Sequence, residues 1–308
     1  MGKNILVTGG AGFIGSSVVD KLLDDGNNVA VVDNLSGGSR ENLNPKAKFY
    51  KIDIQDPKIS EIFQKEKPEI VFHFAAQIDV RKSVQSPVFD AGINILGSLN
   101  ILENCRKFGA KRFIFASSGG AIYGDAKTLP TPEDCEEMPL SPYGIAKLSV
   151  EKYLNYYHEV FGLKFVSLRF ANVYGPRQSP RGEAGVVAIF CDKMLSNKEA
   201  TINGEGKQKR DFVFVKDVVE AKILAMQSNK VGFFNVGTAE ETDINTIFKM
   251  IKEFINSSSK EVHGPANAGE LQRSCLDFSK IKKDLGWQPK YNFKKGLEET
   301  TSWFKNKK

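Results

Sequence analysis

The sequence predicts an α/β protein built on a doubly wound parallel sheet, with a smaller α/β lobe formed mainly by its C-terminal part. Three observations support this fold class. Short apolar strands alternate with helical patterns through the first half of the chain, a glycine-rich turn follows the first strand, and the regular alternation ends after about Gly175. The 308 residues, of which 41% are hydrophobic, suffice to bury a core of that size.

The predicted elements of the large sheet follow from their apolar patterns. Asn4–Thr8 is a short apolar strand, and the helix Phe13–Asp25 follows it with apolar residues at helical spacing. Further strands are expected at Asn28–Asp33, Phe49–Ile52, Ile70–Phe74, Arg112–Ala116 and Lys164–Arg169, and further helices over Pro87–Phe108 and Pro142–Val160. Strands that are apolar along their whole length and separated by helices indicate a parallel sheet covered on both faces.

The pattern changes after Gly175, where segments become shorter and turn residues more frequent. Loops are expected at Gly182–Gly185, Asn203–Gly206 and Gly264–Gly269. We therefore expect residues 1–175 to form the domain of the large sheet. Residues 176–308 are expected to form mainly a second, substrate-binding lobe, with some of their segments returning to the large sheet.

Composition limits the classes of function. The net charge of +6 favours anionic ligands, but the basic residues are spread along the chain without a nucleic-acid-binding motif, so no nucleic-acid partner is expected. No apolar run approaches the roughly 20 residues that span a bilayer, so no membrane partner is expected. The spacing of the cysteines and histidines predicts neither a metal site nor disulfides, which fits a reducing cytoplasm: Cys105, Cys135, Cys191, Cys275, His73, His158 and His263.

A glycine-rich turn connects the first predicted strand to the first helix. Gly9, Gly12 and Gly15 allow a tight turn and a close approach of the backbone to a pyrophosphate at the helix N-terminus. Alone, such a triplet also fits a structural turn. Asp33 ends the second strand, where a carboxylate can bind the adenosine ribose hydroxyls and repels a 2′-phosphate, although it also fits a strand-end turn. Together with Asp53-Ile54 at the end of the third strand, which can cap an adenine, these residues predict a Rossmann domain that binds NAD rather than NADP.

Tyr143 and Lys147 lie one turn apart on the same face of a predicted helix. A free phenol, with a pKa near 10, is a poor base at neutral pH. An ammonium about 4 Å away, at an effective dielectric near 20, would lower the pKa of the phenol by about three units. The positive charge of an oxidised nicotinamide adds to this effect, and together the two could bring Tyr143 into range as a general acid/base. The pair Tyr-x-x-x-Lys also occurs by chance in helices. A catalytic role is favoured here by Ser117-Ser118 at the end of the fifth strand and by the small residues of Phe74-Ala75-Ala76.

Many further motifs occur in one order along nearly the whole chain: His73-Phe74-Ala75-Ala76-Gln77, Asn94, Ser117–Gly124, Ser141-Pro142-Tyr143 with Lys147, Arg169–Gln178, Gly182–Val187, Arg210–Val213 and Leu285-Gly286-Trp287. In these motifs the chain resembles the extended short-chain dehydrogenases/reductases of the NAD-dependent epimerase/dehydratase family, and among them the UDP-glucose (UDP-galactose) 4-epimerases. The resemblance implies NAD-dependent C4 epimerisation of a UDP-sugar, in which Tyr143 takes the proton of the 4-hydroxyl while NAD accepts the hydride from C4.

The resemblance also implies the site residues. Catalysis is expected to use Tyr143, Lys147, Ser118 and Ser117. NAD is expected to contact Gly9, Gly12, Phe13, Ile14, Gly15, Asp33, Asn34, Ser36, Gly38, Asp53, Ile54, Phe74, Ala75, Ala76, Asn94, Tyr143, Lys147 and Ala171. The UDP-sugar is expected to contact Ser118, Tyr143, Asn172, Val187, Asn203, Arg210 and Ser274. The helices near residues 87–108 and 142–160 resemble those that form a homodimer interface in this family.

Three positions bear on the substrate. Gly119 stands where many relatives place a Ser or Thr hydroxyl, so Ser118, Ser117 or a water must supply that hydrogen bond. Asn267 stands where an arginine often pairs with the diphosphate. Ser274 stands where a bulky tyrosine often restricts epimerases to glucose and galactose, so we expect this chain to accept the N-acetylated sugars too.

Other functions remain open from the sequence. A 4,6-dehydratase usually carries an Asp-Glu pair after the fifth strand, and Gly119-Gly120 offers neither acid. A uronate epimerase, decarboxylase or reductase differs mainly in its loops. A non-catalytic NAD-sensing protein would commonly have lost the Tyr143/Lys147 pair, which is present here.

Overall fold

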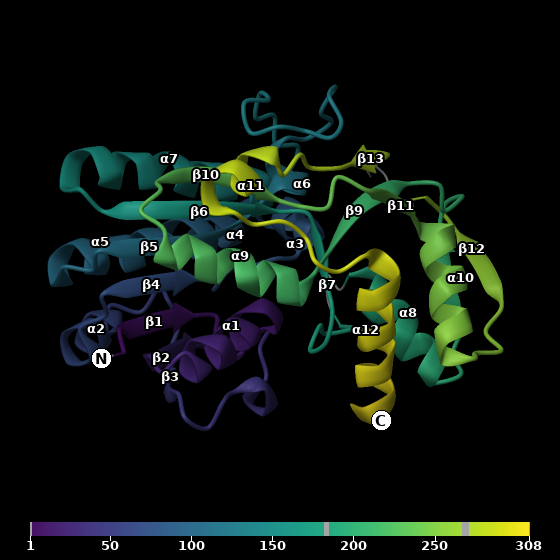
Figure 1. The fold of residues 1–308 in the computed structure, drawn as a ribbon, viewed down its shortest axis with the longest axis horizontal. Helices are drawn as coiled ribbons and strands as arrows, with labels where there is room; N and C mark the ends of the chain where they lie inside the picture. Colours follow the sequence, from purple (N-terminus) through teal and green to yellow (C-terminus); the bar gives the residue numbers. More distant parts are fainter. Residues whose placement is uncertain (1, 182–184, 267–270, 308) are drawn as a thin grey trace.

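Seven parallel strands form the central sheet of the computed structural model, which describes residues 2–181, 185–266 and 271–307. The strand order is β10-β6-β5-β4-β1-β2-β3 (Figure 1). Their bounds are β1 Asn4–Thr8, β2 Asn28–Asp33, β3 Lys48–Lys51, β4 Ile70–His73, β5 Arg112–Ser118, β6 Lys164–Phe170 and β10 Gly232–Val236. The predicted parallel α/β fold is confirmed.

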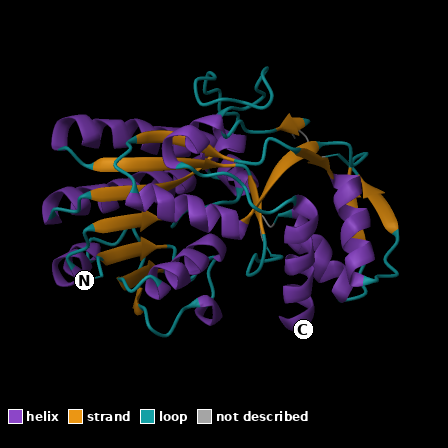
Figure 2. Cartoon of the chain, viewed as in Figure 1, coloured by secondary structure: helices purple, strands orange, loops and turns teal. Residues whose placement is uncertain are grey.

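Helices cover both faces of this sheet because its strands are apolar on both sides (Figure 2). One face packs against α1, α9 and α11 around Trp287, and the other packs against α2, α5 and α7. Their bounds are α1 Phe13–Asp24, α2 Ile59–Glu66, α5 Ser98–Phe108, α7 Pro142–Phe161, α9 Val215–Gln227 and α11 Ser279–Leu285. Although they come from the C-terminal half of the chain, β10 is a strand of the large sheet and α9 and α11 pack against it.

The second lobe packs around its own apolar cluster. A four-stranded sheet joins β7, β9, β11 and β13, and a separate pair joins β8 to β12. The bounds are β7 Asn172–Tyr174, β8 Ala200–Asn203, β9 Lys209–Phe214, β11 Glu241–Asp243, β12 Glu261–Gly264, β13 Arg273–Ser274, α8 Val186–Leu195, α10 Ile244–Ile255 and α12 Phe293–Lys307.

The segment predicted as one helix over Pro87–Phe108 is more complex. It consists of α4 (Pro87–Ala91), a π-helical turn η2 (Gly92–Gly97) and α5, and a short helix α3 (Val80–Gln85) precedes it. The π-helical turn places Asn94 in the interior, where it is 2% exposed. Apolar periodicity cannot distinguish such an inserted turn from a regular helix, since both keep one face buried.

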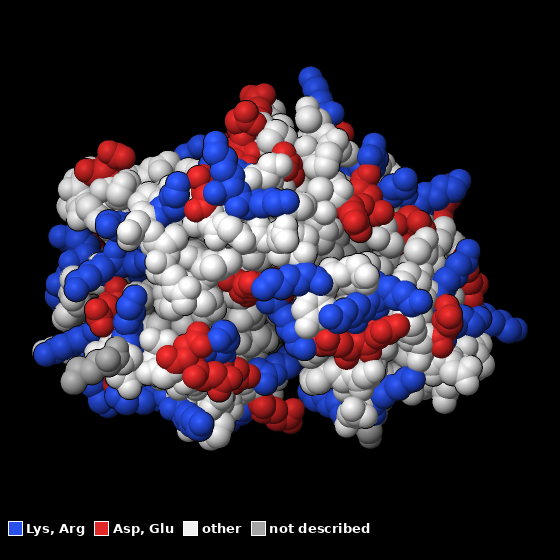
Figure 3. Space-filling view, in the orientation of Figure 1, with Lys and Arg blue, Asp and Glu red and all other residues white. Residues whose placement is uncertain are grey.

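Charged side chains are distributed over the surface as the composition suggested. On the face shown in Figure 3, lysines and arginines are interspersed with aspartates and glutamates. No helix in the described ranges is sufficiently long and apolar to cross a bilayer.

Candidate active site

The turn between β1 and α1 brings backbone, rather than side chains, to the carboxyl edge of the sheet. Gly9 has φ +70°, and a Cβ at this position would lie 2.6 Å from the backbone nitrogen of Ala75. Gly12 is the N-cap of α1 in extended conformation. The first N–H groups of α1 therefore face the space beyond the strand ends, where they can bind an anion.

The Asp33 carboxylate stabilises this turn. Its Oδ2 accepts a hydrogen bond from the backbone N–H of Ala11 (3.0 Å), and its Oδ1 accepts one from Leu35 (2.8 Å). A carboxylate offers about four acceptor sites, so two bonds from the backbone leave capacity for ribose hydroxyls. Asp33 thus serves as a turn-stabilising residue at the place where the predicted ribose contact would lie.

A side-chain hydrogen bond connects the segments that follow β2 and β3, next to Asp33. Asn34 Nδ2 donates to Asp53 Oδ2 (2.7 Å), and the backbone N–H of Ser36 donates to Asn34 Oδ1 (2.9 Å). Gly38 contacts Ala11 so closely that a Cβ would lie 2.8 Å from its carbonyl carbon. The residues predicted to bind the adenosine are therefore close together at one edge of the sheet. Ile54, the last of them, is buried and packs against Gly97 of η2.

The segment after β4 lies against the glycine turn. The backbone N–H of Phe74 donates to Thr8 O (3.0 Å), and that of Ala75 donates to Thr8 Oγ1 (3.3 Å). His73 is 1% exposed and hydrogen bonds with the hydroxyls of Thr8 (2.7 Å) and Ser98 (2.9 Å). Burial lowers the pKa of His73 to about 3, so it is a neutral core histidine.

Asn94 holds this segment in place. Its Oδ1 accepts from the backbone N–H of Gln77 (2.8 Å), and its Nδ2 donates to Gln77 O (2.9 Å) and to Asp90 Oδ1 (2.9 Å). Both amide N–H groups are thus used inside the protein. Asn94 therefore orders the loop between β4 and α3, which contains Gln77. Its amide N–H groups are occupied, so a contact with the cofactor would have to use other atoms.

Tyr143 and Lys147 lie in the first turns of α7. Ser141 caps this helix by accepting from Gly144 N (3.1 Å), and Ser83 Oγ accepts from Tyr143 N (3.2 Å). Lys147 Nζ lies 5.7 Å from the centre of the Tyr143 ring and donates to the carbonyl of Ala116 in β5 (2.9 Å). The two side chains therefore share one helix face at the end of β5.

Burial changes the protonation of this pair in a way that the sequence did not predict. It raises the pKa of Tyr143 well above its ordinary value, and Asp90 raises it further, while a hydrogen bond with Ser118 lowers it. Burial also lowers the pKa of Lys147 to about 8. Desolvation therefore opposes the decrease in the Tyr143 pKa that the neighbouring ammonium and an oxidised nicotinamide are predicted to cause.

Ser117 and Ser118 have different surroundings because consecutive side chains of β5 point to opposite faces. Ser117 is 3% exposed, and its Oγ has no hydrogen-bond partner among the described residues. Ser118 is partly exposed and interacts with the Tyr143 phenol. A Cβ at Gly119 would lie 2.6 Å from Leu276 Cδ1, so Leu276 fills the space that a side chain there would need. Ser118 is therefore the hydroxyl best placed to replace the one absent at Gly119.

The predicted UDP-sugar residues come from different elements of the second lobe. Asn172 is exposed on β7, and Arg210 and Ser274 are paired between β9 and β13. A Cβ at Gly120 would lie 3.5 Å from Ser274 Oγ, which places Ser274 beside the Ser118–Gly120 segment. Arg210 donates to Leu271 O (2.6 Å). Of these residues, Ser274 is the one that the described contacts place next to the segment carrying Ser118.

Comparison with known proteins identifies the family. Residues 5–237 match the model of the NAD dependent epimerase/dehydratase family. The chain belongs to this family. It is 51% identical to a UDP-glucose 4-epimerase of Thermotoga maritima solved with UDP-glucose, with TM-score 0.97 and 99% of each chain covered. A Thermus thermophilus UDP-glucose 4-epimerase solved with NAD is 42% identical, with TM-score 0.94 and 98% of each chain covered. A UDP-N-acetylglucosamine 4-epimerase of Methanobrevibacter ruminantium solved with UDP-N-acetylmuramic acid is 37% identical, with TM-score 0.94 and coverage of 100% of this chain and 99% of that one.

The structure limits how Val187 and Asn203, two of the predicted substrate contacts, could meet a ligand. The Val187 side chain is 1% exposed in the core of the second lobe, so only its backbone N–H, at the N-terminus of α8, can contact a ligand. Asn203 is exposed at the end of β8, beside β9, since Gln208 Nε2 donates to its carbonyl (3.2 Å). Asn267 lies outside the described residues.

Asp211 is a structural residue of the site that the sequence analysis quoted only as part of a motif. Its carboxylate accepts hydrogen bonds from the backbone N–H groups of Thr238 (2.9 Å) and Leu276 (3.2 Å). Burial raises the pKa of Asp211 to about 6. This carboxylate fixes the segment that carries Ser274 and Leu276. An acidic residue directly before the apolar run Phe212–Phe214 was the signal that could have identified it.

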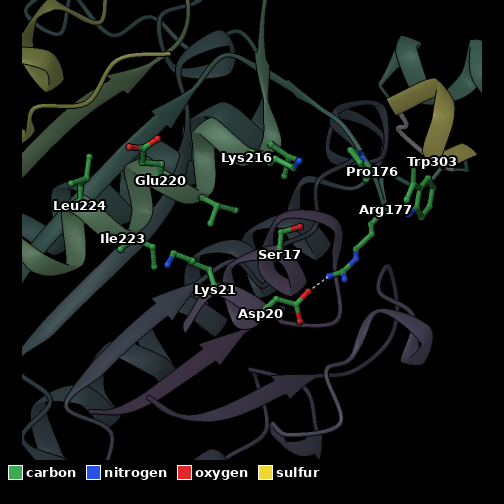
Figure 4. Close-up of a pocket in the computed structure, with 12 residues that line it drawn as sticks. Ser17, Asp20, Lys21, Pro176, Arg177, Lys216, Glu220, Ile223, Leu224 and Trp303 are labelled. Atoms are coloured by element: carbon green, nitrogen blue, oxygen red, sulfur yellow. Dashed lines mark ion pairs between the residues drawn. The ribbon is translucent and has the colours of Figure 1, made fainter. Parts of the chain in front are cut away.

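A cavity of about 670 Å³ lies elsewhere on the molecule, between α1, α9 and Trp303 of α12 (Figure 4). Asp20 and Arg177 form an ion pair on its wall (2.7 Å). None of the predicted site residues lines this cavity. The candidate active site is therefore defined by the strand ends and α7 rather than by this cavity.

Proposed function

We propose that this protein is an NAD-dependent isomerase that interconverts the C4 epimers of a UDP-sugar. The observation that carries the proposal is the position of Lys147 Nζ, 5.7 Å from the Tyr143 ring and hydrogen-bonded to β5. This pair lies at the same sheet edge as the glycine turn and Asp33. The sequences and structures of UDP-glucose 4-epimerases that align with nearly the whole chain support the same activity.

The described residues fit NAD. The close approach of Gly9 to Ala75, which a Cβ would prevent, leaves the backbone of the turn and the N-terminus of α1 available to the pyrophosphate. Asp33, Asn34, Asp53 and Ile54 would hold the adenosine, and Phe74–Ala76, Tyr143, Lys147 and Ala171 would hold the nicotinamide end. Bound NAD supplies a hydride acceptor and donor for C4 of the sugar.

Tyr143 would take the proton from the sugar 4-hydroxyl as C4 is oxidised and return it to the same oxygen when the other epimer forms. Lys147 stabilises the phenolate electrostatically, and its hydrogen bond to Ala116 O fixes its position. Ser118 holds the sugar oxygen. The 4-keto sugar must present its opposite face before reduction, so the site has to release the sugar ring while it retains the nucleotide through Asn172, Asn203, Arg210 and the N–H of Val187.

An assay with three separate substrates tests this function. The purified protein is incubated with UDP-glucose, UDP-N-acetylglucosamine or UDP-glucuronate, and the C4 epimers are resolved by chromatography. We expect interconversion of UDP-glucose and UDP-galactose without net formation of NADH. Loss of a carbon or of water from the sugar would instead identify a decarboxylase or a dehydratase, and absence of any reaction with bound NAD present would exclude the enzyme assignment.

Ser274 is expected to admit a 2-acetamido group, so that UDP-N-acetylglucosamine is also a substrate. Because Ser274 lies beside Gly120, a Ser274→Tyr substitution would fill space next to the sugar. We expect kcat/KM for the N-acetylated sugar to fall roughly 10- to 200-fold, with a much smaller change for UDP-glucose. Ser274→Ala serves as the control that removes only the hydroxyl. A wild-type protein that converts glucose but neither N-acetylated sugar would contradict this specificity.

We further propose that the protein is a homodimer. Exposed apolar side chains gather on α3, α4, η2 and α7, which pack against one another. Val88 is 86% exposed and Leu96 is 62% exposed. The double substitution Val88→Asp/Leu96→Asp should therefore convert the dimer to a monomer, as measured by size-exclusion chromatography with light scattering. Gln288→Asp adds one negative charge, half that of the double substitution, on the exposed α11–α12 connection and should leave the dimer intact. A wild-type monomer at micromolar concentration would refute the proposal.

A further inference from the structure

A buried carboxylate lies next to the catalytic helix. Asp90 of α4 is 0% exposed. Its Oδ1 accepts hydrogen bonds from Gln77 Nε2 (2.9 Å) and Asn94 Nδ2 (2.9 Å). Its Oδ2 is buried without a hydrogen-bond partner among the described residues. A buried polar atom without a hydrogen bond is costly, so this carboxyl oxygen calls for an explanation.

The position of Asp90 relates it to the proton-transfer pair. α4 packs against α7, and the neighbouring α3 is joined to Tyr143 through Ser83 Oγ. The charge of Asp90 acts on both residues of the pair, because it raises the pKa of Tyr143 and the pKa of Lys147. Its two amide partners are neutral and leave this charge uncompensated.

Other ionisable groups near the pair differ from Asp90. Glu151 follows on α7 and also raises the pKa of Lys147, but it forms an ion pair with Arg169 (2.6 Å). Lys222 of α9 lies across β5 and donates to Phe115 O (2.7 Å), and burial lowers its pKa well below the usual value. His73 of β4 is neutral, with its pKa lowered to about 3. Asp90 thus differs from Glu151, because it forms no ion pair with another described residue.

We propose that Asp90 is a positioning residue of the epimerisation, whose uncompensated carboxylate keeps Lys147 charged and Tyr143 protonated until oxidised NAD is in place. The inference rests on the proposed function and adds a control of its proton step. In the absence of the cofactor the phenol retains its proton and the site stays inactive. With oxidised NAD bound, Tyr143 would be able to release its proton to solvent, because the positive nicotinamide would offset the charge of Asp90, and the resulting phenolate could take the proton of the sugar 4-hydroxyl.

The sign of the expected effect follows from the charge. A negative charge raises the pKa of any nearby acid group, so its removal lowers the pKa values of Tyr143 and Lys147 together. The acidic limb of the activity profile reports ionisation of the Tyr143 base, and the alkaline limb reports loss of the Lys147 ammonium. Both limbs should therefore move to lower pH in a variant that lacks the charge. A merely structural role would lower the height of the profile without moving both limbs in the same direction.

The test compares holoenzymes that differ at this carboxylate. In Asp90→Asn, which preserves shape, we expect both limbs of the kcat profile to shift downward by roughly one pH unit. Asp90→Glu retains the charge and should keep the midpoints close to those of the wild type even if its rate is lower. Asp79→Asn is the matched control, because Asp79 caps α3 in the same segment and asparagine can also cap a helix. Its profile should be unchanged.

A second measurement does not depend on turnover. Tyrosinate absorbance is titrated in NAD-loaded protein without sugar, and the Tyr143→Phe signal is subtracted in each background. The Tyr143 midpoint should fall in Asp90→Asn, and this result would stand even if no UDP-sugar were converted, which separates this proposal from the proposed function. Unshifted midpoints would overturn the role of Asp90. If neither Asp90→Asn nor Asp90→Ser folds while Asp90→Glu does, Asp90 serves to hold the fold and the proposal is likewise overturned.

Discussion

Replacing Tyr143 with phenylalanine is expected to lower kcat for C4 interconversion by a factor of roughly 10²–10⁴. The substitution removes the hydroxyl that exchanges a proton with the sugar and leaves the ring packed at the start of α7. Lys147 keeps its hydrogen bond to Ala116 O, because Tyr143 takes no part in it. We therefore expect the cofactor to remain bound, so that the loss concerns the chemical step.

The measurement is the rate of epimer formation together with the NAD content of the purified variant. Tyr153→Phe is the matched control, since Tyr153 lies on the same helix but is 40% exposed. It should retain the wild-type rate. Normal turnover by Tyr143→Phe would remove the basis of the assigned mechanism.

The second large effect concerns stability. Glu151→Ala is expected to lower the free energy of unfolding by about 3–5 kcal/mol, because it removes the fully buried one of the two carboxylates that compensate the Arg169 guanidinium and leaves only the partly exposed Glu137. Arg169 is 1% exposed and donates from Nε and Nη2 to Glu151, which is 0% exposed. Ser167 Oγ donates to the same carboxylate (2.8 Å). This network joins α7 to β6 behind the catalytic pair.

Urea unfolding of protein with a fixed excess of NAD measures the loss, since bound ligand itself contributes to stability. The control is Lys152→Ala, one residue further along α7. Lys152 is largely exposed and pairs with Glu137 (2.9 Å), and such surface pairs contribute about 0–1 kcal/mol. A loss below about 1 kcal/mol for Glu151→Ala would show that the buried pair is not the source of stability that its geometry indicates.

Several elements could be predicted because their signals are local. The strand Asn4–Thr8 and the helix that begins at Phe13 occur at the predicted positions, since apolar runs and glycine punctuation depend on neighbouring residues alone. The protonation of Tyr143 could not be predicted in this way. Its pKa depends on how completely the packed fold excludes water and on the charge of Asp90, and both raise it.

The role of Val187 shows the same limit within the second lobe. The motif places it near the nucleotide, but the packing of α8 turns its side chain into the core and leaves the backbone N–H for a ligand. Leu276, distant in sequence from Gly119, fills the space beside it. Neither contact has a local signal, because each depends on how two separate elements meet.

By itself, the sequence determined the alternation of strands and helices, the dinucleotide turn and the Tyr143/Lys147 pair, since each is encoded by spacing within a few turns of chain. Only the tertiary structure decided which charges surround that pair, which serine faces the phenol and which lobe residue reaches Gly120. These properties arise from desolvation and from contacts between segments far apart in the chain, and both require the packed fold.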